Sequence, residues 1–260
     1  MKFCANLGFM FTEASSILER YSLAKDAGFK AVESGFPLGF TLEQVRDAKE
    51  KAGIEHVLIN LKTGDVTKGE LGVTAVPGKE NEFKENFETT LNYAKALNAK
   101  KIHIMAGKLD NPTSQNWDTY EANLKYAADV LKTENILGVI EPINQYSVPN
   151  YFLSDFHKAL DIIKRINSPN LKLMLDIFHL QQLMGDISHS ITKFMPYVGH
   201  VQIAQVPHRN EPDTPGEINY QFVLEQLISN GYQDWIGLEY KPLKNSKEGL
   251  VWIKKYGYTL

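Results

Sequence analysis

The segment Gly199-His200-Val201-Gln202-Ile203-Ala204-Gln205-Val206-Pro207 begins as a short, mostly apolar run and is ended by a proline. The polar stretch His208-Arg209-Asn210-Glu211-Pro212-Asp213-Thr214-Pro215-Gly216-Glu217 follows it. The apolar run predicts a β-strand, and the prolines predict that it opens into a loop. A strand that carries a polar side chain inward and then opens into a charged loop is typical of an active-site rim, although most such loops are only solvated connections. The ends of the other strands decide between these interpretations.

Apolar runs alternate with amphipathic segments along the whole chain. Besides the segment above, the predicted strands are Lys2–Leu7, Lys30–Glu33, His56–Asn60, Lys101–Met105, Ile136–Glu141, Leu171–Asp176 and Trp235–Glu239. The predicted helices are Glu13–Ala27, Thr41–Gly53, Glu80–Leu97, Trp117–Lys132, Ser154–Ile166, Leu180–Phe194, Asn219–Ser229 and Lys247–Tyr256. Eight alternating pairs predict an α/β fold, a single (β/α)8 TIM barrel that forms one domain over residues 1–260. An open doubly wound sheet is the alternative, but no strand is followed by a Gly-rich dinucleotide-binding turn.

The composition argues against two classes of partner. Hydrophobic residues make up 43% of the 260 positions, and 28 basic against 31 acidic residues give a net charge of −3. This balance provides no electrostatic attraction for nucleic acid or for an anionic membrane, so we expect neither as a partner. No apolar run approaches the roughly 20 residues that a helix needs to cross a bilayer.

The single cysteine, Cys4, excludes an intrachain disulfide and is typical of a reducing compartment. Its place in an apolar strand favours a packed thiol over a nucleophile. Asn6 and Gly8 interrupt the apolar N-terminal run and no small-residue cleavage site follows, so we expect no secretory signal. These features predict a cytoplasmic protein, and a homo-oligomer is compatible with them.

Four consecutive predicted strands carry an oxygen ligand at the end where active sites of such barrels lie. These residues are Glu141, Asp176, Gln202 and Glu239. One of them alone would be an ordinary polar residue at a strand end, but four in register favour a metal site. Three carboxylates and an amide oxygen form a hard ligand set that suits Mg²⁺ or Mn²⁺ far better than structural zinc. Carboxylates on both sides of a polarised carbonyl suit proton removal and return at neighbouring carbons.

The sequence resembles the hydroxypyruvate isomerase family of the xylose isomerase-like sugar isomerase and epimerase barrels. The matching segments are Val139-Ile140-Glu141-Pro142-Ile143-Asn144, Asp176-Ile177-Phe178-His179, Gly199-His200-Val201-Gln202-Ile203-Ala204, Pro207 with Arg209, Glu211-Pro212, Gly216-Glu217-Ile218-Asn219-Tyr220 and Gly237-Leu238-Glu239-Tyr240. They cover nearly the whole chain. Ketose 3-epimerases, which are similar barrels, have a histidine at the position of Gln202.

The resemblance implies a metal-assisted isomerase that interconverts hydroxypyruvate and 2-hydroxy-3-oxopropanoate (tartronate semialdehyde) by proton transfer through an enediolate. It implies metal ligation by the four strand-end residues and catalysis by Glu141 and Glu239. The resemblance also implies that His179 contacts the substrate. The planar guanidinium of Arg209 suits the substrate carboxylate. His208 and Glu217, in the same predicted loop as Arg209, are further candidates for substrate binding. Each of these has an alternative as a surface or supporting residue.

Two polar residues inside predicted strands, Glu33 and His103, could line the pocket or be satisfied core groups. Phe9, Met10 and Phe11 could wall the pocket or only pack. Loops 61–79 and 106–116 are long enough to be lids or binding loops, and their roles are left open.

Three alternatives to the hydroxypyruvate assignment remain. A 2-oxo-tetronate isomerase would share the motifs and the mechanism, with these loops accommodating one more carbon. A non-catalytic barrel that binds sugar acids would bind without turnover, which a complete ligand set argues against. An endonuclease for damaged DNA shares the superfamily fold, but it needs a His-rich three-zinc site and a basic groove, and this chain has seven histidines and a negative charge.

Overall fold

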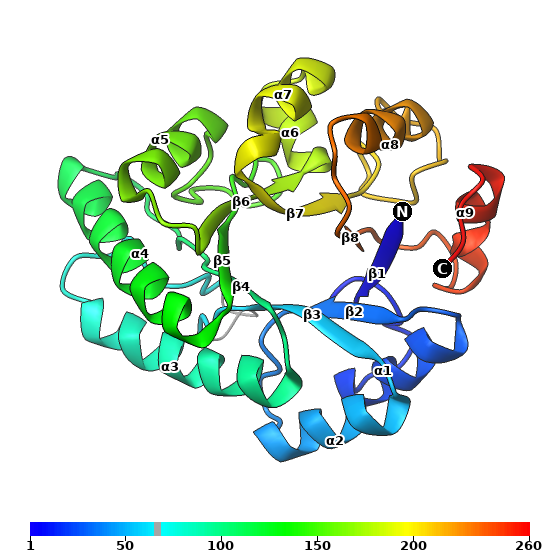
Figure 1. Cartoon of the computed structure of the whole chain (residues 1–260), viewed down its shortest axis with the longest axis horizontal. Coiled ribbons are helices and arrows are strands. Elements are labelled where there is room, and N and C mark those ends of the chain that lie inside the picture. The colour runs from blue at the N-terminus through cyan, green and yellow to red at the C-terminus, as the bar shows by residue number, and fades with distance from the viewer. Residues whose placement is uncertain (65–68) are drawn as a thin grey trace.

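A computed structural model describes residues 1–64 and 69–260, and the strands of this part form a closed parallel barrel in the order β1 to β8 (Figure 1). Each strand pairs with the next, and β8 pairs with β1. The strands are β1 (Lys2–Asn6), β2 (Ala31–Ser34), β3 (Glu55–Asn60), β4 (Lys101–His103), β5 (Leu137–Ile140), β6 (Leu171–Asp176), β7 (Val198–Ile203) and β8 (Trp235–Leu238). The predicted TIM barrel is confirmed.

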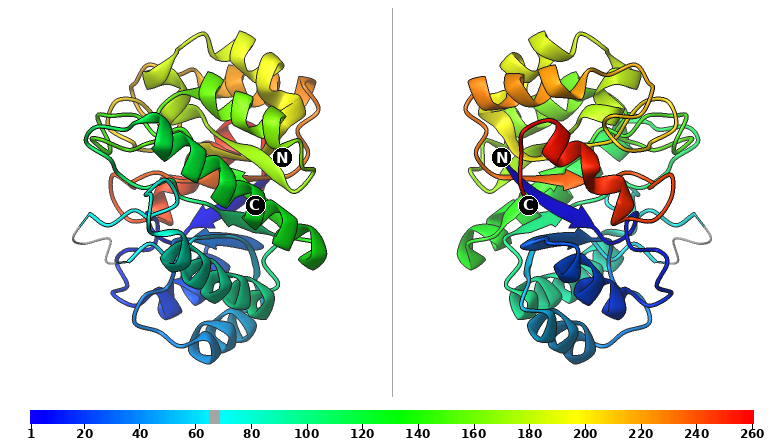
Figure 2. Two further views of the ribbon diagram at one scale, coloured as in Figure 1. Left: turned by 90° about the vertical axis from the view of Figure 1, so that its left-hand side faces the viewer. Right: turned by 90° about the vertical axis from the view of Figure 1, so that its right-hand side faces the viewer.

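Helices surround these strands on the outside of the barrel (Figure 1), and Figure 2 shows the same arrangement from two sides. They are α1 (Ile17–Asp26), α2 (Leu42–Ala52), α3 (Glu80–Leu97), α4 (Ser114–Glu134), α5 (Phe156–Ile166), α6 (Ile177–Leu183), α7 (Ile187–Phe194), α8 (Tyr220–Ser229) and α9 (Val251–Lys255). Short 3₁₀ turns, Met195–Tyr197 and Glu248–Leu250, precede β7 and α9. The large apolar core lies between strands and helices, where Phe3 of β1 packs edge-on against Trp252 of α9.

The ends of α2 show how local sequence sets an element's boundaries. The Gln44 amide donates to Thr41 Oγ1 at 3.3 Å, and the Thr41 amide donates to Gln44 Oε1 at 2.9 Å. This reciprocal pair satisfies two of the amides that a helix start leaves unpaired. Gly53 ends the helix with a φ of 60°, a left-handed conformation that glycine adopts without strain. The predicted capping box and glycine stop are confirmed.

Several predicted helix boundaries were wrong. Helix α5 begins at Phe156, and its N-cap is Asp155 rather than Ser154, because the Asp155 carboxylate accepts the amides of His157 and Lys158. The single helix predicted over Leu180–Phe194 is two helices, α6 and α7. They are separated where Gly185 and Asp186 adopt φ values of 64° and 44°, which end a right-handed helix.

Helix α6 also starts earlier than predicted, directly after β6, with the side chain of Asp176 as its N-cap. His179 therefore lies in the first turn of α6. Similarly, α1 starts at Ile17 behind the cap Ser16, and the final helix begins as a 3₁₀ turn.

Alternation along each strand decides which side chains enter the barrel. Successive strand residues point to opposite faces, so residues two apart share a face. Phe3 and Ala5 of β1 belong to the outer apolar core, whereas Cys4 and Asn6 contact Glu33 of β2. By the same parity His200 lies one layer below Gln202 on β7. The barrel interior is thus built in layers, with the strand-end residues uppermost.

Candidate active site

The ends of β5 to β8 bring together the four residues predicted to hold a metal. Asp176 and Gln202 are directly paired across β6 and β7, and Gln202 is paired with Gly237, two residues before Glu239. Glu141 follows the last residue of β5, as Glu239 follows that of β8. The strand register therefore places all four side chains at the C-terminal end of the barrel interior.

Glu141, Asp176 and His179 form the tightest part of this group, with ligating atoms that all lie within 4.8 Å of one another. His179 Nε2 is 3.7 Å from Glu141 Oε1 and 3.6 Å from Asp176 Oδ2. The three residues are at most 4% exposed. Two acids and an imidazole are thus packed together without water-exposed surface, which is the geometry of a ligand site rather than of a solvated loop.

Unpaired atoms show where a ligand would fit. Among the described residues, four buried side-chain atoms have no hydrogen-bond partner: His103 Nε2, Tyr120 Oη, Glu141 Oε1 and Gln202 Oε1. Buried polar atoms are almost always paired, so three such atoms at one end of the barrel indicate a missing partner. Two of them are oxygens of predicted metal ligands. The oxygen-rich donor set also matches the preference of Mg²⁺ and Mn²⁺, and the residues present therefore fit a divalent cation.

The carboxyl groups of this cluster are shifted toward their protonated forms. Burial raises the pKa of Glu141 well above its usual range, and the nearby Glu239 and Asp176 raise it further. Burial also raises the pKa of Glu239 to about 8, against the opposing effect of Arg209. For Asp176 the same burial outweighs Arg209, so its pKa is raised as well. Carboxyl groups whose pKa values are raised can exchange protons with a substrate more readily than ordinary carboxylates.

Arg209, the predicted carboxylate contact, lies inside the site. Its guanidinium is sandwiched between the rings of Phe9 and Phe178, at 4.5 Å and 4.7 Å from their centroids. It is paired with the Glu239 carboxylate and lies 3.5 Å from Asp176 Oδ2. The side chain is 14% exposed, so it is not fully closed off from solvent. A held, planar cation beside the acids is well placed for an anionic substrate.

His179 has a defined tautomer. The Asn144 backbone amide donates to His179 Nδ1 at 3.2 Å, and the Asn144 side-chain nitrogen lies 2.7 Å from the same atom. Because Nδ1 accepts, Nε2 carries the proton and faces Glu141 and Asp176. Burial, with Arg209 and His103 nearby, holds the pKa of His179 well below its usual value, so the ring is a neutral donor.

The two polar strand residues whose roles the sequence leaves open, Glu33 and His103, have different surroundings in the structure. His103 Nε2 lies 3.7 Å from Glu141 Oε2, too far for a hydrogen bond, and burial lowers the pKa of its ring to about 3. Glu33, by contrast, is fully bonded inside the barrel. Its burial would raise its pKa, but the neighbouring His200, Gln202 and Asn6 lower it overall. His103 thus faces the site, whereas Glu33 lies beneath it.

The remaining predicted contacts lie on the surface of the loop after β7. His208 is exposed, and exposed Glu217 accepts a bond from Gln181 at 3.2 Å. The structure does not bring either residue into the cluster, and their substrate-binding roles stay predictions. Of loop 61–79, residues 65–68 lie outside the described part. In the other long loop, α4 begins at Ser114, so residues 114–116 are helical.

Sequence reasoning missed Asn6, Asn144, Phe178 and His200 as parts of the site and its support. Asn6 and His200 had a usable signal, because each is a polar residue on the inward face of an apolar strand. The role of Phe178 depends on the course of the loop that carries Arg209, which local sequence does not specify.

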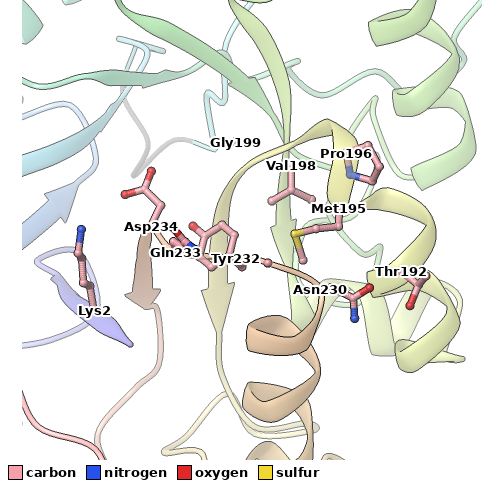
Figure 3. Close-up of a pocket in the computed structure, with 11 residues that line it drawn as sticks. Lys2, Thr192, Met195, Pro196, Val198, Gly199, Asn230, Tyr232, Gln233 and Asp234 are labelled. Carbon is pink, nitrogen blue, oxygen red and sulfur yellow. The ribbon is translucent and has the colours of Figure 1, made fainter.

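A pocket of about 710 Å³ opens at the opposite end of the barrel (Figure 3). Its lining includes Lys2 at the start of β1, Val198 at the start of β7 and Asp234 before β8. These are N-terminal strand ends, where barrels of this class do not carry their active sites. Among the described helices, none is both long enough and apolar enough to cross a membrane.

The fold and the site together define a TIM barrel with a buried acidic cluster at the C-terminal ends of β5 to β8. The chain belongs to the xylose isomerase-like TIM barrel family, whose model matches residues 21–256. It is 44% identical to a putative hydroxypyruvate isomerase of Danio rerio, over 98% of this chain and 95% of the relative. Its identity to the hydroxypyruvate isomerase of Escherichia coli K12 is 38%, over 98% and 99% of the two chains.

Two further similarities bear on function. A 2-oxo-tetronate isomerase of Cupriavidus necator is 36% identical over 98% of both chains. A solved structure from Brucella melitensis, described as an AP endonuclease of family 2, has a TM-score of 0.94 and 38% identity over 98% of both chains. The predicted resemblance to the hydroxypyruvate isomerase family is confirmed by these full-length similarities.

Proposed function

We propose that this protein is a metal-dependent isomerase that interconverts hydroxypyruvate and tartronate semialdehyde. The observation that carries the proposal is the pairing of two glutamates with raised pKa values, Glu141 and Glu239, on either side of Asp176 and Gln202. Full-length similarity to relatives named hydroxypyruvate isomerase supports the same substrate.

Glu141, Asp176, Gln202 and Glu239 would hold Mg²⁺ or Mn²⁺. The bound cation would withdraw electron density from the substrate carbonyl and make the adjacent C–H more acidic. Side chains of the protein would bind the substrate and transfer the protons. Arg209 holds the substrate carboxylate, and the Nε2–H of His179 donates to a substrate oxygen.

The proton transfers follow from the chemistry of the two isomers. One of the glutamates removes a proton from C3 of hydroxypyruvate, which leaves an enediolate across C2 and C3. The other glutamate returns a proton to C2, while the C3 hydroxyl proton passes to the oxygen on C2. The C2 carbonyl thereby becomes a hydroxyl and C3 becomes an aldehyde. Acid–base catalysis of this kind contributes about 10²–10⁴-fold to the rate.

A 2-oxo-tetronate isomerase is the second candidate, because one relative carries that name and the same site chemistry serves the longer substrate. The endonuclease described for the Brucella melitensis structure is less well supported here. The possible metal-holding groups among the described residues contain one histidine each, and the net charge is −3. A non-catalytic binder would not need two proton-exchanging acids. Cytoplasmic location and a homo-oligomer stay predictions.

Nuclear magnetic resonance in D₂O tests this function. Protein loaded with Mg²⁺ is incubated with hydroxypyruvate and, separately, with 2-oxo-tetronate. We expect isomerisation of at least one substrate, with solvent deuterium at the carbon that receives the proton. The faster substrate distinguishes the two isomerase candidates. If the protein binds the metal but turns over neither compound, the isomerase proposal is wrong.

A further inference from the structure

Glu33 is a buried acid that the proposed reaction does not use. It lies on β2 without exposed surface, and a Cβ added to Gly237 of β8 would overlap its carboxylate. The barrel therefore keeps a glycine opposite Glu33 to make room for it. Burying a carboxylate is costly unless donors surround it, so the donors around Glu33 indicate its role.

Three nitrogen donors from β1 and β7 bond to this carboxylate. His200 Nε2 lies 2.5 Å from Oε2, while Gln202 Nε2 and Asn6 Nδ2 lie 2.7 Å and 2.9 Å from Oε1. Cys4 Sγ is a weaker fourth donor at 3.5 Å from Oε2. Both carboxylate oxygens are thus occupied, and each donor comes from the inward face of its strand.

The network continues from His200 toward the other end of the barrel. Lys101 Nζ lies 3.1 Å from His200 Nδ1 and 2.7 Å from Asp234 Oδ2, beside the pocket in Figure 3. An ammonium group can only donate, so Nδ1 accepts and Nε2 carries the proton toward Glu33. Lys101 thus donates both to Asp234 and to His200, and the hydrogen bonds from Lys101 through His200 to Glu33 run in one direction, with Glu33 as the final acceptor.

A carboxylate that only accepts fixes the amide it contacts. The Gln202 side chain must turn its nitrogen toward Glu33, which leaves Oε1 on the other side, buried and without a partner among the described residues. We propose that Glu33 is a positioning residue that turns the oxygen of Gln202, rather than its nitrogen, toward the cation site. This inference rests on the metal site of the proposed function.

Asn6 extends the effect of Glu33 to Glu239. The Gly8 amide donates to Asn6 Oδ1 at 2.9 Å, so the Asn6 nitrogen is turned toward the carboxylates. That nitrogen bonds Glu33 at 2.9 Å and Glu239 Oε1 at 3.1 Å. Glu33 thereby orients one proposed ligand directly and is linked through Asn6 to a second.

Cys4, Glu33 and His200 lie close enough together to be considered as a metal site themselves. The 2.5 Å between His200 Nε2 and Glu33 Oε2 argues against it. Two ligands of a tetrahedral site with bonds of about 2.1 Å are about 3.4 Å apart. The spacing is that of a hydrogen bond, and Lys101 adds a positive charge to the same network.

The test is calorimetric titration of the apoprotein with Mn²⁺, which needs no turnover. Glu33→Gln cannot accept from both Gln202 and His200, so we expect Mn²⁺ affinity to fall about 10- to 100-fold, the usual effect of losing a group that orients a ligand. The swap variant Glu33→Gln/Gln202→Glu restores a donor–acceptor pair with exchanged roles, and its affinity should return to within about tenfold of the parent. Glu211→Gln is the matched control, since the carboxylate of buried Glu211 accepts from the Leu243 amide and, among the described residues, from no donor of either acidic cluster.

Each outcome decides the proposal. An affinity of Glu33→Gln within about twofold of the parent would overturn it. So would a swap variant as weak as the single variant, because Glu33 would then have only a packing role. If circular dichroism shows that Glu33→Gln is unfolded, a folded, metal-binding swap variant supports the pairing, and failure of both to fold overturns it. A parent that binds Mn²⁺ but isomerises neither substrate removes the proposed function and leaves this inference standing, whereas a parent that binds no divalent cation removes both.

Discussion

Two acidic clusters of similar composition lie one above the other in this barrel. The lower one consists of Cys4, Glu33 and His200, the upper one of Glu141, Asp176 and His179, and all six residues are buried. In the lower cluster each carboxylate oxygen accepts a hydrogen bond. In the upper cluster an oxygen of Glu141 has no partner among the described residues, and the imidazole contacts are 3.6–3.7 Å long.

The difference teaches that the types of residue in a cluster do not decide its role. A closed set of hydrogen bonds holds its members at bonding distance and leaves no room for another group. In an open set, buried acids lack donors, so burial raises their pKa values, which costs stability unless a ligand binds. The lower cluster is therefore part of the scaffold, and the upper one is the proposed site.

The largest effect is expected from removing an acid of the upper cluster. Glu141→Gln or Glu239→Gln should each lower kcat by about 10²–10⁴-fold, because an amide cannot exchange the substrate proton. Steady-state kinetics with the preferred substrate measures this loss. Cys4→Ser, which changes the lower cluster instead, should retain kcat within about tenfold of the parent. Wild-type kcat in Glu141→Gln or Glu239→Gln would remove that residue from the proton transfers.

Metal affinity should depend on pH through the upper cluster. Glu239 has a raised pKa of about 8 without metal, and a metal ligand must be deprotonated. Mn²⁺ affinity should therefore rise as pH increases from 6 to 8, by about tenfold per unit for each proton displaced, and level off above that range. Calorimetry in buffers with different ionisation enthalpies measures the released protons. An affinity that is constant over this range would contradict the assignment of Glu239 as a ligand.

Gly237→Ala should disturb the lower cluster without removing any polar group. The added methyl would overlap the Glu33 carboxylate, and overpacking of this kind costs about 1–3 kcal/mol of stability. Urea unfolding followed by circular dichroism gives the value. Gly78→Ala is a useful comparison, because no described residue other than its chain neighbours has an atom within 4 Å of a Cβ there, although its φ of 81° adds strain. Equal denaturation midpoints for the parent and Gly237→Ala would show that the Glu33 layer can move freely.

The smallest effect is expected at the far end of the network. Asp234→Asn keeps an oxygen that can accept from Lys101 and removes a charge that is 48% exposed. Because the Asp234 side chain is half exposed and buried Lys101 keeps an acceptor in the asparagine oxygen, the unfolding free energy should fall by about 1 kcal/mol and Mn²⁺ affinity should hardly change. The same urea and calorimetric measurements apply. A loss of several kcal/mol would mean that the lower cluster depends on its solvent-facing end.

The barrel and its four strand-end residues could be predicted because both depend on short-range patterns. Apolar runs alternate with amphipathic helices, and parallel strands carry their last residues to one end. The break between α6 and α7 depends on the conformation of Gly185 and Asp186, and the start of α6 depends on the Asp176 cap. Composition alone does not distinguish these from a continuous helix.

The support beneath the site was not predictable in this way. Glu33 and His200 are 167 positions apart, and Lys101 and His200 are 99 apart. A polar residue on an inward strand face indicates that a partner exists, but only the closed barrel brings the particular partner into contact. The sandwich of Arg209 between Phe9 and Phe178 has the same origin.

The glycine at position 237 also has a consequence for how the sequence can diverge. The Glu33 carboxylate fills the space that a Cβ at position 237 would need, so position 237 cannot gain a side chain while Glu33 keeps its place. In diverging relatives these two positions, which lie on β2 and β8, should vary together or not at all. A lineage that acquired a side chain at position 237 would first need a shorter residue at position 33. That change would also remove the hydrogen bond that orients Gln202.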